Sequence, residues 1–340
     1  MHDVARAAGV STKTVSRVVN GEAYVARETA DRVLLAIREL GFRRNDMAHL
    51  LRKQLPTSTI GLVIEDLGNP FYAAVARAAE QVARRRNCTL IAASSEEDPE
   101  HEQELLSNLL SRRVDGLLLV PAAGDHRYLT AERRLGTPVV FLDRPPTGIE
   151  ADVVLLDNFR GAFDAIDHLL RSGHKRIGLV SGQGSVWTGA ERLRGYRAAF
   201  AAHGVPLDES LIKEGCLDVA DTEHKVRGLL AAPGPPTAIF ACNNRACLGA
   251  LRAVAHSRPR AAVIGFDDFE LAELLAPPVS VVSHDPTEMG RAAAELLFSR
   301  IDGDTRPPQR VTLPVHLVLR GTDGPGRRGV DVTTLTQPRG

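Results

Sequence analysis

The sequence is poor in cysteine and aromatic residues, and it contains no long apolar run. Its 340 residues include four cysteines and 4% aromatic residues, with a single tryptophan. The cysteines have neither the spacing of a zinc site nor the density of a disulfide scaffold, which favours a reducing compartment. No run of about 18 apolar residues is present, so no membrane helix is predicted. The first residues, Met1-His2-Asp3, do not read as a secretory signal, and we expect a cytoplasmic protein.

Motifs for catalysis and for cofactor binding are missing as well. Neither half of the body, residues 59–323, carries a G-x-G-x-x-G segment or a P-loop, and no G-x-S-x-G elbow is present. Its 11 histidines do not cluster at the spacing of metal ligands. We therefore expect no catalytic residues, no metal site and no cofactor, and we do not expect an enzyme.

Basic residues are concentrated at the start of the chain, although the net charge is zero. Residues 1–55 contain ten Lys or Arg and six Asp or Glu, whereas the remaining residues contain 32 basic and 36 acidic ones. A basic first segment on a mildly acidic body indicates a polyanionic partner for that segment. A chance excess of surface charge is the alternative. A chain of this length and ordinary composition predicts at least two globular domains.

Residues 1–41 have the spacing of three short helices. The first ends at Gly9, and the second, from Thr12 to Asn20, has Ser11 at its N-cap position. Two short helices around a glycine turn predict a helix-turn-helix, whose second helix can enter the DNA major groove. Apolar residues recur at helical spacing in the second and third helices and predict their inner faces. These residues are Val15, Val18 and Val19, followed by Ala30, Val33, Leu34 and Ile37.

The polar face of the second helix carries the groups that DNA recognition requires. Thr12, Lys13 and Arg17 are expected at base edges, because Lys and Arg can donate to guanine and Thr can meet a thymine methyl group. The other polar residues are better suited to phosphates, which carry no sequence information. They are Ser11, Thr14, Ser16 and Asn20. The alternative is a three-helix bundle with a solvated polar face.

Beyond residue 59, short apolar runs alternate with amphipathic stretches. This alternation predicts parallel sheets with helices on both faces, arranged as two doubly wound lobes. The strand candidates are residues 60–65, 89–93, 116–120, 139–142, 153–156, 177–180, 238–241, 262–265 and 279–282. The principal helix candidates are residues 70–86, 99–113, 159–171, 188–203, 243–255 and 286–300.

Residues 3–20 of the head read D-V-A-R-A-A-G-V-S-T-K-T-V-S-R-V-V-N, and the body contains Asn69-Pro-Phe-Tyr72, Asp143-Arg144 and Ile264-Gly-Phe-Asp-Asp268. These segments closely resemble the LacI/GalR family of bacterial transcription regulators. The resemblance covers about residues 1–322. The resemblance implies an all-α helix-turn-helix head on an α/β periplasmic-binding-protein-like body. It also implies a homodimeric repressor of carbohydrate-related genes, released from a palindromic operator by a small polar effector such as a sugar.

The resemblance also implies a division of the chain. The head is expected at residues 1–41, and a hinge helix and linker at 42–58. One lobe would combine 59–157 with about 285–314, the other 158–284 with about 315–323, and 324–340 would be a disordered tail.

In the hinge helix, Leu51 would wedge between base pairs of the minor groove, with Asn45 and Ala48 beside it. Packing of Leu51 against the body is the alternative. Arg44 departs from the family, which commonly has proline there.

Effector residues are expected at the carboxyl ends of strands, where ligands bind in doubly wound folds. The resemblance implies that polar residues hydrogen-bond the effector, namely Asp143, Arg192, Asn243 and either Asp267 or Asp268. Phe71 and Tyr72 would pack on its apolar faces, and Trp187 offers a further aromatic surface. Trp187 could instead belong to the core, and Asp143 could pair with Arg144. Leu217 and Asn244 depart from residues common in the family, so no particular sugar is predicted.

Two other classes of protein remain open at this point. A periplasmic-type small-molecule binding protein would have similar lobes but no DNA-binding function. A doubly wound enzyme would require the motifs that are missing here. Salt-dependent binding to DNA distinguishes a regulator from both.

Overall fold

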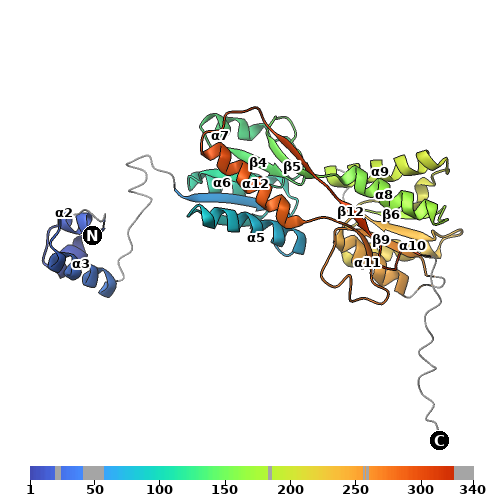
Figure 1. Cartoon of the computed structure of the whole chain (residues 1–340), viewed down its shortest axis with the longest axis horizontal. Coiled ribbons are helices and arrows are strands. Elements are labelled where there is room, and N and C mark those ends of the chain that lie inside the picture. Colours follow the sequence, from blue (N-terminus) through green and yellow to red (C-terminus); the bar gives the residue numbers. More distant parts are fainter. Residues whose placement is uncertain (20–23, 41–56, 183–185, 256, 258–259, 325–340) are drawn as a thin grey trace, which may run out of the picture. The chain divides into compact units, whose positions relative to one another are not determined.

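The computed structural model describes residues 1–19, 24–40, 57–182, 186–255, 257 and 260–324. Within it the chain forms two compact units, Met1–Thr57 and Ser58–Gly340, called here the head and the body. Figure 1 shows the helices of the head and the mixed helices and strands of the body. Four predicted DNA-contacting residues lie outside the described residues, namely Asn20, Asn45, Ala48 and Leu51.

The head consists of α1 (His2–Ala8), α2 (Thr12–Val19) and α3 (Arg27–Glu39), which confirms the predicted helix-turn-helix. Gly9 ends α1 in the left-handed conformation, with φ of 64°, and its amide donates to carbonyls of the last turn of α1. Glycine adopts this conformation without steric cost, so the chain can turn sharply into α2. The small core between the helices contains Val4, Ala5, Ala8, Val15, Val33 and Ala36.

The predicted inner face of α3 was wrong at one position. Leu34 is 41% exposed, whereas Val33 and Ala36 are buried and Ile37 packs beside them. Successive helical residues are rotated by about 100°, so a face centred on Val33 and Ala36 turns Leu34 away. The small side chain of Ala36 allows close contact with α1, whose own buried residues include Ala5 and Ala8.

The body contains two six-stranded sheets. The first has the order β11-β5-β4-β3-β1-β2, and all its neighbouring strands are parallel. Its strands are β1 (Thr59–Ile64), β2 (Thr89–Ser94), β3 (Gly116–Leu119), β4 (Val139–Leu142), β5 (Asp152–Leu156) and β11 (Arg310–Leu313). We call this sheet and its helices the first lobe.

The second sheet has the matching order β12-β10-β9-β8-β6-β7 and is parallel except for β12, which runs antiparallel to β10. Its strands are β6 (Ile177–Val180), β7 (Ile212–Lys213), β8 (Ala238–Ala241), β9 (Ala262–Phe266), β10 (Ser280–Ser283) and β12 (His316–Val318). We call this sheet and its helices the second lobe. All nine predicted strands are present, and β7, β11 and β12 are additional.

Helices cover the sheets, and most begin at an Asp or Asn cap. They are α5 (Pro70–Arg85), α6 (Pro99–Ser111), α7 (Thr130–Arg134), α8 (Asn158–Arg171), α9 (Trp187–His203), α10 (Val219–Ala231), α11 (Asn244–Ala255) and α12 (Pro286–Ile301). Although distant in sequence, α12 packs against α5 (Figure 1). Gly290 permits this approach, because a Cβ there would lie 2.2 Å from the Val75 carbonyl oxygen.

Among the described residues, no helix combines the length and apolar character of a membrane span.

The chain passes between the two lobes three times. It leaves β5 for α8, leaves β10 for α12, and runs from β11 directly to β12. These connections are neighbours, because Leu156 pairs with Leu313 and Ser283 pairs with His316. The lobes are therefore joined along one edge, and the carboxyl ends of their parallel strands face a common space.

Candidate functional site

The N-terminal end of α2 carries the polar residues predicted to contact DNA. The Ser11 hydroxyl caps the helix, accepting from the Thr14 amide at 3.1 Å, and lies 2.9 Å from the Thr14 hydroxyl. Lys13 and Arg17, one turn apart, are exposed. Val15, on the opposite side, is fully buried in the head. The helix thus presents its cationic side chains on the surface while its valine anchors it to α1 and α3.

Replacing Ser11 by alanine is expected to loosen the start of α2. The substitution removes the cap from the Thr14 amide, which costs about 1 kcal/mol of helix stability. Backbone amides of α2 should then exchange with solvent about fivefold faster, as measured by hydrogen exchange of the full chain. Ser11→Asp retains a capping oxygen and is the control. Equal exchange in Ser11→Ala and in the unsubstituted chain would contradict this role.

A cavity of about 430 Å³ lies between the lobes, at the carboxyl ends of both sheets. The residues after β1 and β4 line it from the first lobe, and those after β6, β8 and β9 line it from the second. Six of the predicted effector residues meet there, namely Phe71, Tyr72, Asp143, Arg192, Asn243 and Asp267. Residues from distant parts of the sequence thus form one polar site.

The other two predicted effector residues lie elsewhere. Trp187 packs against the core of the first lobe, and the Arg310 guanidinium lies 5.9 Å from the centre of its ring. Asp268 pairs with Arg320 through contacts of 2.7 and 2.9 Å. Neither residue lines the cavity. Asp267, rather than its neighbour Asp268, is the residue that faces it.

Two aspartates occupy matching positions in the two lobes. Asp143 follows β4 and Asp267 follows β9, and each of these is the fourth strand of its sheet in chain order. Both have positive φ, 63° and 69°, which Asp tolerates better than most residues. Their amides donate to the carbonyls of Val154 and Val282 on the adjacent strands. The same backbone turn therefore places one carboxylate on each side of the cavity.

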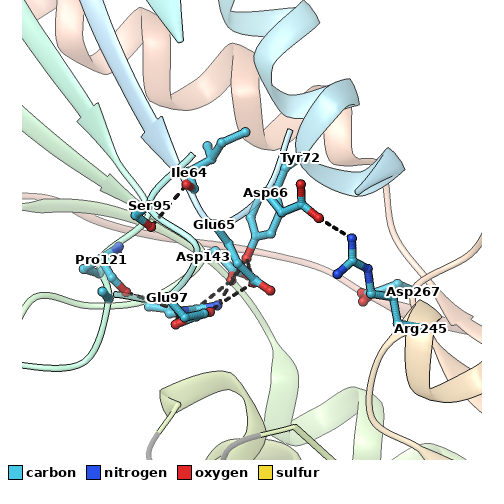
Figure 2. A network of polar contacts seen from close by, with 12 residues as sticks. Ile64, Glu65, Asp66, Tyr72, Ser95, Glu97, Pro121, Asp143, Arg245 and Asp267 are labelled. Atoms are coloured by element: carbon cyan, nitrogen blue, oxygen red, sulfur yellow. Dashed lines mark hydrogen bonds and ion pairs between the residues drawn. The ribbon is translucent and has the colours of Figure 1, made fainter. Parts of the chain in front are cut away.

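In the first lobe, Arg144 organises a buried network of polar groups. Figure 2 labels other members of this network, among them Glu65, Tyr72 and Glu97. Its Nη1 and Nη2 contact both carboxylate oxygens of Glu97, at 2.8 and 2.5 Å, and Nη2 lies 3.0 Å from Glu65. The Tyr72 hydroxyl lies 3.1 Å from Glu65 Oε2 and 3.2 Å from Asp143 Oδ2. Three carboxylates therefore surround one guanidinium and one phenol.

This crowding of carboxylates changes their protonation. Burial and the neighbouring Glu97 raise the pKa of Glu65 to about 7, although Arg144 opposes the shift. Burial also raises the pKa of Asp143, against the effects of Arg144 and Arg192. A full set of negative charges on these side chains is therefore unfavourable near neutral pH.

The second lobe contributes Arg192 and Asp267. Arg192 donates from Nε to Asn158 Oδ1 at 2.7 Å and from Nη1 to the Cys242 carbonyl, and its guanidinium lies 3.7 Å from the centre of the Phe266 ring. Its Nη2 lies 3.8 Å from Asp267 Oδ1. Burial raises the pKa of Asp267, but Arg192 and a hydrogen bond with His284 outweigh it and hold that pKa below its usual value. Asp267 is therefore an ionised acceptor at neutral pH.

Direct contacts also join the lobes across the cavity. Asn244 Nδ2 donates to Asn69 Oδ1 at 2.8 Å, and Arg245 forms an ion pair with Asp66, which Figure 2 shows as a dashed line. These contacts link the start of α11 with the loop between β1 and α5. A ligand that changes the separation of the lobes would change these contacts as well.

Sequence reasoning missed Glu65, Glu97 and Arg245 as cavity residues, and it treated Arg144 only as a partner for Asp143. Glu65 and Asp66 directly follow β1, so the rule that ligands bind at strand ends could have found them. Glu97 lies in the loop after β2, and Arg245 lies in the first turn of α11. No sequence signal pairs these residues with partners in other segments.

Replacing Glu65 by glutamine is expected to change how stability depends on pH. A carboxyl with a raised folded-state pKa stabilises the fold below its unfolded value, near 4.5, and this contribution is lost as pH rises through about 7. Glu65→Gln should therefore raise the free energy of unfolding at pH 8 by about 1–2 kcal/mol, with little effect at pH 5. Urea unfolding at both pH values measures this. Glu270→Gln, an exposed carboxylate outside the cavity, is the control; an equal effect there would contradict the prediction.

Comparisons with known proteins agree with this arrangement. A model of the lacI family of bacterial regulatory proteins matches residues 1–45, and a model of a periplasmic binding protein-like domain matches residues 166–322. The ribose operon repressor of Haemophilus influenzae is 33% identical over 325 residues, which cover 94% of this chain and 97% of the repressor.

Solved structures are similar over nearly the whole chain. The transcriptional regulator CelR in complex with cellobiose is 32% identical, with a TM-score of 0.72, covering 94% of this chain and 98% of CelR. The lac repressor dimer bound to operator and the anti-inducer ONPF is 26% identical, with a TM-score of 0.79, covering 95% of this chain and 98% of the repressor.

A helix-turn-helix head followed by a two-lobed body with a polar cavity defines a ligand-responsive transcription regulator. The chain belongs to the LacI family of bacterial regulatory proteins. Its similar proteins are repressors and transcription regulators, and the family resemblance found in the sequence is confirmed.

Proposed function

We propose that this protein is a homodimeric repressor of carbohydrate-related genes, released from a palindromic operator by a small polar effector, a sugar. The observation that carries the proposal is the presence in one chain of a DNA-binding helix and a cavity lined by carboxylate, amide and guanidinium groups. Such groups hydrogen-bond the hydroxyls of sugars. The cellobiose complex of CelR and the operator-bound dimer of the lac repressor support the two parts of the proposal.

The head reads the operator through α2. Thr12, Lys13 and Arg17 contact base edges, and the remaining polar residues position the helix on phosphates. A two-fold dimer requires two half-sites related by the same symmetry, which makes the operator palindromic. In the hinge, Leu51 enters the minor groove, with Asn45 and Ala48 beside it. Because the proposed activity is binding to DNA and not the catalysis of a reaction, we assign no catalysis to this protein. We place it in the cytoplasm.

The effector contacts six residues of the cavity, and its binding is coupled to operator binding by the head. Asp143, Arg192, Asn243 and Asp267 hydrogen-bond its polar groups, and Phe71 and Tyr72 pack on its apolar faces. A ligand held by both lobes fixes the angle between them, and this angle controls whether the two heads of the dimer fit the operator. Coupling of this kind is reciprocal, so the operator must weaken effector binding by the factor by which effector weakens operator binding.

Measurement of both affinities on one preparation tests this function. Operator sites are first selected from random duplex DNA, and sugars that release the protein are then identified. We expect specific DNA binding that weakens steeply with salt, as counterions are released from phosphates. An effector affinity that is identical with and without operator would refute the coupling. The absence of any preference for one duplex over a scrambled competitor would refute DNA recognition itself.

A further inference from the structure

Three neighbouring strands of the first sheet begin where the chain arrives from the head. β1 starts at Thr59, and in the sheet it lies between β2 and β3. The three strands are parallel and begin at the same level, because Thr59 pairs with Thr89 and Ile60 pairs with Gly116. The segments that precede β2 and β3 therefore lie on the two sides of the start of β1.

These two segments, residues 84–88 and 111–115, contain five arginines and a single acidic residue, Asp115. All five arginines are exposed. We call them the basic edge, and they are Arg84, Arg85 and Arg86 before β2, and Arg112 and Arg113 before β3.

The opposite ends of the same three strands have the opposite charge. The segments after β1, β2 and β3, at residues 65–69, 95–98 and 120–125, contain six acidic residues and no basic residue. The chain beyond residue 55 is mildly acidic, so the basic edge does not reflect a general excess of cations. A lobe with this polarity attracts a polyanion to the edge at which β1 begins and repels it from the effector cavity.

Most of the positive charge of the basic edge is available to a partner. Arg85 and Arg112 form no ion pair with another residue in the described part of the chain. Arg84 is 74% exposed, and its Nε lies 3.8 Å from Glu80, which is a weak surface contact. Arg86 is paired more closely, at 2.6 Å from Asp302.

The two groups of arginines come from helices on opposite faces of the sheet. α5 packs against Ile60 and Leu62 on one face, and α6 packs against Val63 on the other. Both helices end at the basic edge, and cations in a last helical turn also stabilise the helix dipole. One strand separates β2 from β3, so their starting points are about 10 Å apart. Duplex DNA carries one negative charge per about 1.7 Å of its axis, so a surface of this width can meet several phosphates.

We propose that the basic edge is a second DNA-binding surface, which contacts phosphates of the same duplex that the head recognises. The inference rests on the proposed function only for the presence of that duplex. Residues 41–58 join the head to β1, and 18 residues span at most about 60 Å, so DNA held by the head stays at a high local concentration near this edge. Guanidinium groups form charge-assisted hydrogen bonds with phosphate oxygens, and such contacts carry no sequence information.

A double substitution that removes two of these charges tests the proposal. The full chain with Arg85→Gln and Arg112→Gln is titrated with an operator selected from random DNA, and with a scrambled duplex, over a series of salt concentrations. Each lost phosphate contact lowers the slope of log affinity against log salt by about one, so the slope should fall by about two. Affinity near 0.1 M salt should fall by about tenfold or more, and by the same factor for both duplexes. Fluorescence anisotropy measures both quantities.

Two further variants distinguish phosphate contacts from other effects of the substitutions. Arg85→Lys with Arg112→Lys keeps both charges and should bind DNA nearly as the unsubstituted chain does. Arg171→Gln with Lys175→Gln removes two exposed cations from the end of α8 and the turn before β6, the equivalent place in the second lobe, and should leave the slope unchanged.

Several results would overturn the inference. They are an unchanged slope in the Arg85→Gln and Arg112→Gln chain, an equal fall in the α8 control, an equal loss in the lysine variant, or a loss confined to the operator. Failure of the unsubstituted chain to prefer its operator would instead overturn the proposed function. The slope for scrambled DNA would still decide whether the basic edge binds phosphates.

Discussion

Replacing Arg192 by methionine is expected to abolish the response to the effector while operator binding is retained. Arg192 is buried, lies against Phe266, and faces the cavity beside Asp267. Removing one partner of a buried charge pair costs about 2–5 kcal/mol, so effector affinity should fall by about 30-fold or more. Methionine preserves the apolar stem that packs on the Phe266 ring. Effector titration of the operator complex, followed by fluorescence anisotropy, measures the change.

A neighbouring arginine provides the control for this experiment. Arg194 lies on the same helix, but its side chain is 60% exposed and pairs with Glu191. Arg194→Met should leave both effector affinity and operator affinity nearly unchanged, because an exposed ion pair contributes little. Urea unfolding of Arg192→Met shows whether the body remains folded. A folded Arg192→Met chain with normal effector affinity would remove Arg192 from the proposed site.

Replacing Arg17 by alanine is expected to reduce operator specificity more than overall DNA affinity. Arg17 is exposed on α2, one turn after Lys13, on the helix that the head holds through Val15. A bidentate contact with a guanine contributes about 1–3 kcal/mol of discrimination against the wrong base. Affinity for the preferred operator should therefore fall by about 10–100-fold, whereas affinity for scrambled DNA should fall much less.

Arg6 is the matched control in the same head. It lies on α1, and its side chain is 84% exposed beside Asp3. Arg6→Ala removes the same charge, so any loss of affinity should be similar for operator and scrambled DNA and should shrink at high salt. Competition binding at two salt concentrations separates the two kinds of contact. If Arg17→Ala behaves in the same way as Arg6→Ala, base readout by Arg17 is contradicted.

Most of the fold could be predicted from the sequence, because the principal strands are continuous apolar runs. Such runs are typical of parallel strands buried on both faces, and β1, β3, β4 and β9 are of this kind. The strands that were missed are different. β7 has two residues. β11 and β12 are edge strands that consist mostly of exposed and partly buried residues, and each begins at an exposed one, Arg310 and His316. Their pairing comes from tertiary contacts rather than from local pattern.

The candidate site could be predicted only in part, for a related reason. The sequence shows which polar residues follow strands, and six of the predicted effector residues line the cavity. It does not show which side chains pair. Glu65, Glu97 and Arg144 follow different strands and meet only after the sheet forms. Trp187 was predicted from its position just before the expected helix at residues 188–203. It is the first residue of α9, and apolar contacts with the first lobe hold it outside the cavity.

The three neighbouring connections between the lobes restrict the direction in which the lobes can swing. A single connection would let one lobe rotate in many directions relative to the other. Three neighbouring connections can bend together about only one axis. Ligands that fill the cavity to different extents should then change the opening of the body along the same arc. Weak and strong effectors of this protein are expected to differ in the angle through which they rotate one lobe relative to the other. The axis of that rotation should be the same for all of them.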